Sequence, residues 1–215
     1  MRFFLVSFLL ALLAACTTLP ESADPASDAP EGPRPIAAFK DASTYTEALL
    51  LWRTPEDVNA WVGAKFHYSM PRAMLLSETQ RSKSAQVAIH EPRAFFAEPS
   101  GICVDLSRFA VETLRHINPE LNASYVMIEF APVTMGGNTL RLHWLASFER
   151  DGKHYFFADS KRPGHIAGPY ASVQEFIAEY SAYRNRAVVA FRELESYQRK
   201  QRAMASKQSR DERRP

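Results

Sequence analysis

The chain of 215 residues has only two cysteines, Cys16 and Cys103, so it cannot carry the disulfide framework that stabilises many small secreted domains. Its longest apolar stretch, from Phe3 to Ala15, is 13 residues broken only by Ser7, which is too short for a transmembrane helix. The six histidines do not recur at the spacing of metal ligands, and basic residues are not interleaved with aromatic ones. We therefore expect no metal, no cofactor and no nucleic-acid partner.

The first sixteen residues have the pattern of a lipoprotein signal. Arg2 is a minimal basic region, the apolar run follows, and Leu13-Ala14-Ala15-Cys16 resembles the bacterial lipobox, whose cysteine is lipidated and becomes the new N-terminus. An ordinary secretory signal that ends near a cysteine is the alternative. No Asp follows Cys16, which by resemblance to enteric-type sorting rules favours the outer membrane. We expect a signal peptide over 1–15 and a lipid anchor that holds the protein in the bacterial cell envelope, facing the periplasm.

The rest of the chain divides into three parts. Residues 16–44 are rich in Pro, Ala, Ser and acids without apolar periodicity, so we expect the lipidated cysteine to be followed by a disordered tether. Residues 45–185 have the length of one domain. Residues 186–215 are expected to form the end of a C-terminal helix and a basic tail. From Gln198 the tail has seven Lys or Arg against two acids, which suits a solvated end or contact with an anionic surface.

Local patterns predict the elements of the domain. Thr54-Pro55-Glu56-Asp57 is typical of a helix start, with a capping Thr and Pro in the first turn. An apolar stripe predicts a helix from Cys103 that stops before Asn118-Pro119. The remaining expected elements are a brief strand over 66–68, strands over 124–131, 139–148 and 154–160, and a helix opened by a capping box at Ser172 to Glu175.

Cys103 is the residue most suited to chemistry. At a helix start, unpaired backbone N–H groups and the positive end of the helix dipole favour thiolate over thiol. Burial as a small apolar residue is the alternative. However, the apolar stripe runs through Ile102 and Leu106, so we expect the thiol to point sideways into a cleft. His143 and Asp159, on two strands of one predicted hairpin, can supply a base and a group that orients it.

The turn of this hairpin decides whether His143 and Asp159 meet. A two-residue Asp151-Gly152 turn would pair Arg150 with Lys153 and place Trp144 opposite Asp159. A three-residue turn with a bulge would pair Glu149 with Lys153 and place His143 directly opposite Asp159, on one face. The sequence allows either turn, and the proposed chemistry needs the bulged one.

Taken in order, the segments Gly101-Ile102-Cys103-Val104-Asp105, His143-Trp144 and the strand ending in Asp159 resemble the transglutaminase-like superfamily. The resemblance covers roughly residues 54 to 160 and is strongest to bacterial transglutaminase-like cysteine proteinases. It implies an α+β fold with a transglutaminase-like or papain-like core, in which the catalytic helix packs on a small antiparallel sheet.

The same resemblance implies a role for each residue. Cys103 would be the nucleophile, His143 the base, and Asp159 the group that fixes the imidazole tautomer. Oxyanion or cleft positions are expected among Trp61, His67, Tyr68 and Trp144. Asp105 is expected to be structural or an ion ligand.

Two classes of function follow. The first is a membrane-tethered thiol enzyme, a peptidase, amidase or acyltransferase, which cleaves or transfers the acyl groups of protein or peptide amides in the envelope. The sequence does not separate hydrolysis from transamidation. The alternative is a catalytically inactive transglutaminase-like module for binding or assembly, because a fold can persist after its activity is lost.

Overall fold

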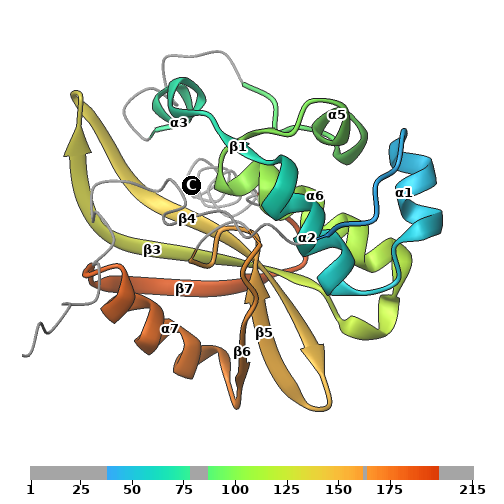
Figure 1. The fold of residues 1–215 in the computed structure, drawn as a ribbon. Helices are drawn as coiled ribbons and strands as arrows, with labels where there is room; N and C mark the ends of the chain where they lie inside the picture. Colours follow the sequence, from blue (N-terminus) through green and yellow to red (C-terminus); the bar gives the residue numbers. More distant parts are fainter. Residues whose placement is uncertain (1–37, 78–86, 162–163, 199–215) are drawn as a thin grey trace, which may run out of the picture.

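The computed structural model describes residues 38–77, 87–161 and 164–198. The predicted signal peptide, Cys16, most of the tether and the basic tail after Gln198 lie outside these residues. The described chain forms six α-helices, a five-stranded antiparallel sheet and a two-stranded parallel sheet, so the predicted mixed α+β class is confirmed (Figure 1). Within the same ranges, no helix has the length and apolar character needed to cross a membrane.

Three of the six helices in the described residues begin where the sequence predicts them. Their bounds are α1 (Tyr45–Leu51), α2 (Pro55–Lys65), α3 (Met70–Leu76), α5 (Pro92–Ala97), α6 (Cys103–Ile117) and α7 (Val173–Tyr183), with a 3₁₀ turn at Pro119–Leu121. At the start of α2, the Thr54 hydroxyl accepts the Asp57 N–H at 3.2 Å, and the Asp57 carboxylate accepts the Thr54 N–H at 3.2 Å. The Ser172 hydroxyl likewise accepts the Glu175 N–H at 3.2 Å at the start of α7. The predicted starts of α2, α6 and α7 are confirmed.

The large sheet has the strand order β6-β5-β4-β3-β7. Its strands are β3 (Ser124–Met135), β4 (Asn138–Arg150), β5 (Lys153–Phe157), β6 (Ala167–Tyr170) and β7 (Val188–Leu194), and the small sheet pairs β1 (His67–Tyr68) with β2 (Ser100–Gly101). The predicted strand over 154–160 is shorter than expected. It ends at Phe157 because Ala158 and Asp159 have φ angles of 58° and 78°, in the left-handed region that no strand uses.

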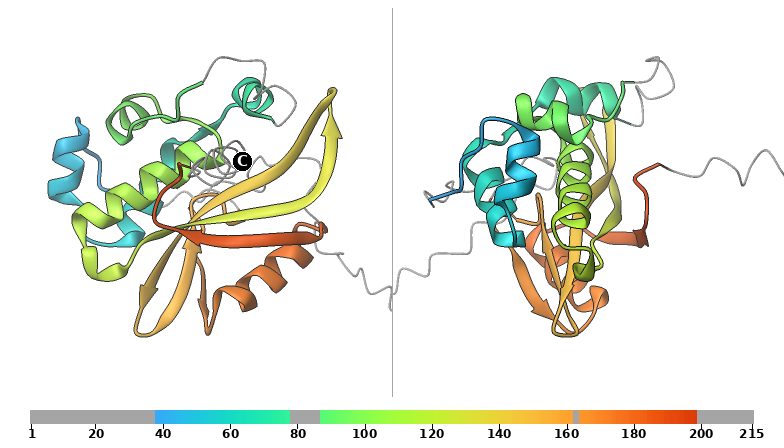
Figure 2. Two further views of the ribbon diagram at one scale, coloured as in Figure 1. Left: turned by 180° about the vertical axis from the view of Figure 1, so that it is seen from behind. Right: turned by 90° about the vertical axis from the view of Figure 1, so that its right-hand side faces the viewer.

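The large sheet separates two apolar clusters. Tyr125, Met127 and Trp144 pack with α6 on one face, whereas Ile128 and Phe130 pack with α7 on the other. Figures 1 and 2 show these two helices on opposite sides of the sheet. Because successive side chains of a strand point to opposite faces, the register of β4 decides which helix each of its residues meets.

The turn between β4 and β5 decides between the two alternatives that the sequence allows. Asp151 and Gly152 form a two-residue turn with φ angles of 52° and 67°, and Arg150 pairs with Lys153. The structure thus has the two-residue turn and not the bulged turn, which would pair Glu149 with Lys153 and which the proposed chemistry needs. A two-residue turn with both φ angles positive matches the twist of the flanking strands, and the Asp-Gly pair is well suited to it.

Strand β7 corrects one prediction. Residues 188–194 were expected to belong to a C-terminal helix end, but they pair with β3 at the edge of the sheet. Val188, Val189 and Phe191 are β-branched or aromatic and favour a strand over a helix. Phe191 packs against the apolar cluster on the face of the large sheet that α7 covers, so this segment is part of the domain rather than its solvated end.

Candidate thiol site at the start of helix α6

Cys103 is the first residue of α6, as predicted, but the residue is only 4% exposed. It belongs to the apolar cluster on the α6 face, together with Leu106 and Phe109. The expectation that the thiol turns away from the core is therefore wrong. The position corresponds to the alternative interpretation, in which the cysteine packs as a small apolar residue.

Asp105 is the centre of the polar contacts at this helix start. Its carboxylate is fully buried and accepts hydrogen bonds from Arg72 Nε and Nη2, both at 2.7 Å. It also accepts the backbone N–H groups of His90 at 2.9 Å and Ile102 at 3.0 Å. One carboxylate thus joins α3, the segment before α5, and the N-cap of α6. These four contacts support the structural role expected for Asp105.

Gly101 leaves the space that this carboxylate occupies. A Cβ atom at position 101 would lie 2.9 Å from both Cβ and Oδ2 of Asp105, closer than side chains tolerate. The Gly-x-Cys-x-Asp pattern is therefore explained by packing: the glycine admits the aspartate that caps the helix.

Replacing Gly101 with Ala is expected to lower the free energy of unfolding by about 1–3 kcal/mol, the usual cost of an added methyl in a packed interior. Gly101→Ser should cost at least as much because its side chain is larger. Urea unfolding of the two variants measures the effect. A Gly101→Ala protein as stable as the wild type would show that the carboxylate can move aside.

Strand β1 lies beside the residues that lead into Cys103. The His67 N–H donates to the Pro99 carbonyl at 2.8 Å, and Tyr68 is paired with Gly101 in the parallel ladder. Two of the predicted cleft residues are thus carried by a strand next to the thiol segment. A third, Trp61, lies in α2 and stacks on Phe96 with ring centroids 4.8 Å apart.

His143 lies on the opposite face of the large sheet from Cys103. It pairs with Ile128, and its ring stacks on Tyr180 of α7 with centroids 5.9 Å apart. Trp144, the next residue, points to the α6 face and packs in the cluster that contains Cys103. Among the described residues, the ring nitrogens of His143 make no contact with Cys103.

His143 does meet Asp159, but through the backbone. Its Nε2 lies 3.2 Å from the Asp159 carbonyl and 3.0 Å from the Tyr180 hydroxyl, which itself donates to that carbonyl at 3.3 Å. A carbonyl can only accept, so these contacts assign the proton to Nε2. Nδ1 is buried and has no hydrogen-bond partner among the described residues. The side-chain contact expected between the imidazole and the Asp159 carboxylate is replaced by this backbone contact.

The surroundings keep His143 neutral. Burial lowers its pKa well below 6.5, the positive charges of Arg184 and Arg186 lower it further, and the hydrogen bond to the Asp159 carbonyl opposes the change. Both arginines are almost fully buried. Arg184 donates to the Tyr180 hydroxyl at 3.1 Å, and Arg186 Nη2 donates to the Leu140 carbonyl at 2.6 Å. An imidazole in this setting is poorly suited to become an imidazolium beside a thiolate.

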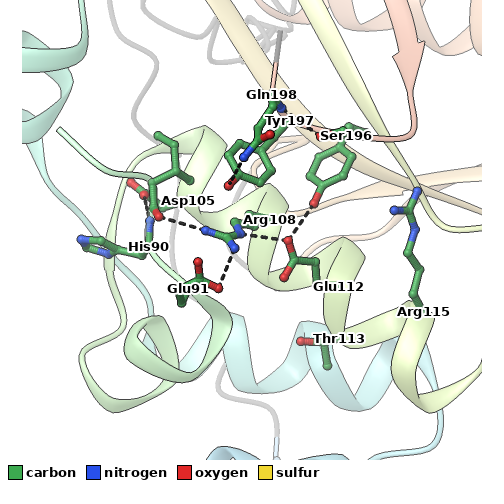
Figure 3. A network of polar contacts seen from close by, with 12 residues as sticks. His90, Glu91, Asp105, Arg108, Glu112, Thr113, Arg115, Ser196, Tyr197 and Gln198 are labelled. Atoms are coloured by element: carbon green, nitrogen blue, oxygen red, sulfur yellow. Dashed lines mark hydrogen bonds and ion pairs between the residues drawn. The ribbon is translucent and has the colours of Figure 1, made fainter. Parts of the chain in front are cut away.

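A second polar network connects the C-terminal end of the described chain, at Glu195 and Tyr197, to α6 (Figure 3). Arg108 is held by Glu91 at 2.6 Å and Glu112 at 2.9 Å, and its guanidinium lies 4.6 Å from the centre of the Tyr197 ring. Arg115 binds the carboxylate of Glu195 at 2.8 Å. Apart from the Arg108–Glu112 pair, which lies four residues apart on one helix, these contacts join distant residues, up to 89 positions apart for Arg108 and Tyr197, and no local pattern indicates them.

The described residues contain no group of three or more His, Cys, Asp and Glu side chains placed to hold a metal ion. A scan of the chain against protein-family models found no match, and a search among curated proteins also found none. The catalytic roles of Cys103, His143 and Asp159 thus stay predictions, and the geometry of the site is the basis for the function proposed next.

Proposed function

We propose that this chain is a non-catalytic module of the transglutaminase-like type, which binds a protein or peptide in the bacterial cell envelope and is held at the outer membrane by lipidated Cys16. One observation carries the proposal: Cys103 and His143 lie on opposite faces of the large sheet. The intact order of cysteine, histidine and aspartate in the sequence is compatible with descent from an enzyme whose site no longer assembles.

The separation matters because a thiol nucleophile needs its base within hydrogen-bond reach, about 2.6–3.2 Å, or through one water. His143 is instead held by Tyr180 on the far face, in its neutral form. On the near face, β4 presents Trp144 to the cluster around Cys103. An apolar ring cannot take the proton of the thiol.

A thiol enzyme that transfers or hydrolyses amide acyl groups is the second candidate. It is favoured by the position of Cys103 at the first residue of a 15-residue helix, where the dipole favours thiolate. For His143 to act as its base, β4 would have to shift by one residue, which moves every side chain of a strand to the other face. Otherwise another base would be needed, and His67 is the histidine whose strand adjoins the thiol segment.

The two candidates are separated by alkylation of Cys103 with iodoacetamide in the folded protein between pH 5 and pH 10. For a buried, structural thiol we expect slow alkylation that rises only near or above the ordinary thiol pKa of about 8.5. We also expect the same profile in His143→Ala and His67→Gln. Alkylation in urea confirms that the thiol is intact in each variant.

A rapid reaction well below pH 8 that is lost in either variant would overturn the non-catalytic proposal. Loss in His143→Ala would assign the base to His143 and imply the shifted register. Loss in His67→Gln alone would assign it to His67.

A further inference from the structure

A pocket of about 480 Å³ lies between residues 41–46, the end of α2, and α5. Its lining does not include Cys103, His143 or Asp159. The volume is within the range of sites that bind small molecules, about 300–1,000 Å³. Its side chains combine a rigid aromatic wall with two positive charges, which together indicate a class of ligand.

The wall of the pocket is the ring of Phe96. It is half-buried and stacks on Trp61 at an interplanar angle of 8°, while the rings of Tyr45 and Trp52 lie 6.0 and 5.9 Å from it. Three aromatic neighbours thus hold Phe96 in place, so the part of the ring that is exposed is fixed before any ligand arrives. A fixed aromatic surface suits a flat apolar group, which can stack on it with little loss of side-chain entropy.

The positive charges come from Lys65 and Arg93. Within the described residues neither forms an ion pair: the Arg93 guanidinium reaches only the Thr46 hydroxyl, at 3.4 Å, and the Lys65 ammonium lies 5.1 Å from the centre of the Phe39 ring. Asp41 is the one acid in the lining, and its carboxylate accepts the Ala42 N–H. Two cations and one anion leave the pocket with a net charge of +1.

We propose that this pocket binds a carboxylate carried on a flat apolar body, such as the C-terminal end of a peptide that finishes in an aromatic residue. Arg93 and Lys65 pair with the carboxylate, and the aromatic group stacks on Phe96. A single negative charge matches the net charge of the lining, whereas Asp41 opposes a ligand with two. This inference deepens the proposed function and rests on it, because it names the site and ligand class of a binding module.

Calorimetric titration of the full chain in detergent micelles tests the proposal with three probes. N-acetyl-phenylalanine has the carboxylate and the ring, N-acetyl-phenylalaninamide lacks only the charge, and acetate lacks the ring. We expect saturable binding of the acid, and at least tenfold weaker binding of the amide and of acetate. The proposal would be overturned if the acid showed no saturable binding, or if the acid and the amide bound with equal affinity.

Variants place the binding in this pocket. Arg93→Gln and Lys65→Gln are each expected to weaken binding of the acid at least fivefold and to reduce its preference over the amide. Arg53→Gln is the matched control, because Arg53 is exposed near the same helices but does not line the pocket. It should change the affinity less than twofold, and an equal loss in Arg53→Gln would show a general charge effect and end the proposal.

The outcome is independent of the alkylation experiment, which reports only on Cys103. A reactive thiol together with ligand binding would refute the non-catalytic proposal and leave the pocket standing. An inert thiol without ligand binding would refute the pocket proposal and leave the non-catalytic proposal standing.

Discussion

Asp105→Ala is expected to lower the free energy of unfolding by about 3–5 kcal/mol, the usual loss when one partner of a buried ion pair is removed. The change deletes four hydrogen bonds at once and leaves the Arg72 guanidinium, whose side chain is 14% exposed, without its carboxylate. It also removes the cap from Ile102 at the start of α6. Urea unfolding followed by circular dichroism measures the loss.

Two variants make this measurement specific. Asp105→Asn retains the shape and some acceptor capacity, so it should lie between the wild type and Asp105→Ala. Glu56→Gln breaks an exposed ion pair, in which the side chain of Glu56 is 53% exposed and that of Arg150 is 37% exposed. This change should lower the free energy of unfolding by less than about 1 kcal/mol. If Asp105→Ala were no worse than Glu56→Gln, Asp105 would not be the structural centre of this helix start.

Elements whose limits are set by neighbouring residues could be predicted from the sequence. Thr54 and Ser172 cap helices through residues three positions away, and Pro119 stops α6 from continuing. Strand β7 was missed although its composition favours a strand. Its conformation depends on pairing with β3, about 65 residues earlier, and a neighbouring helix and basic tail suggested a helical end.

The candidate site was harder to predict because it depends on register. The sequence places Cys103, His143 and Asp159 in a suitable order, and two turns were compatible with Asp151-Gly152. A difference of one residue in the turn changes the face on which β4 presents His143 relative to β5. The structure has the two-residue turn, and the residue that meets the α6 face is Trp144.

The partners of His143 could not be found locally either. Tyr180 is part of α7, and its hydroxyl reaches an imidazole 37 positions earlier in the chain. Arg184 and Arg186 follow α7 and look like ordinary surface residues in the sequence, but the fold buries them beside β3 and β4. Contacts of this kind arise only when distant elements pack together.

Burial of neutral His143 is expected to make the protein less stable as the pH falls below about 6.5. The unfolded chain takes up a proton on this imidazole near its ordinary pKa of 6.5, whereas the folded chain does not, because burial and the charges of Arg184 and Arg186 lower the pKa. Below 6.5 the unfolded state therefore binds more protons. The free energy of unfolding should fall by up to about 1.4 kcal/mol for each pH unit, until the pKa of the folded state is reached.

His143→Gln isolates this contribution, since glutamine retains an N–H donor and does not titrate. Its overall stability is expected to be lower because the stacking on Tyr180 is lost. The informative quantity is the difference in unfolding free energy between the two proteins, measured by urea denaturation from pH 8 to pH 5. That difference should be constant above pH 7.5 and should shrink steadily below pH 6.5, as only the wild type loses stability through this residue. A constant difference over the whole range would mean that His143 can be protonated in the folded state, as a working base would need to be.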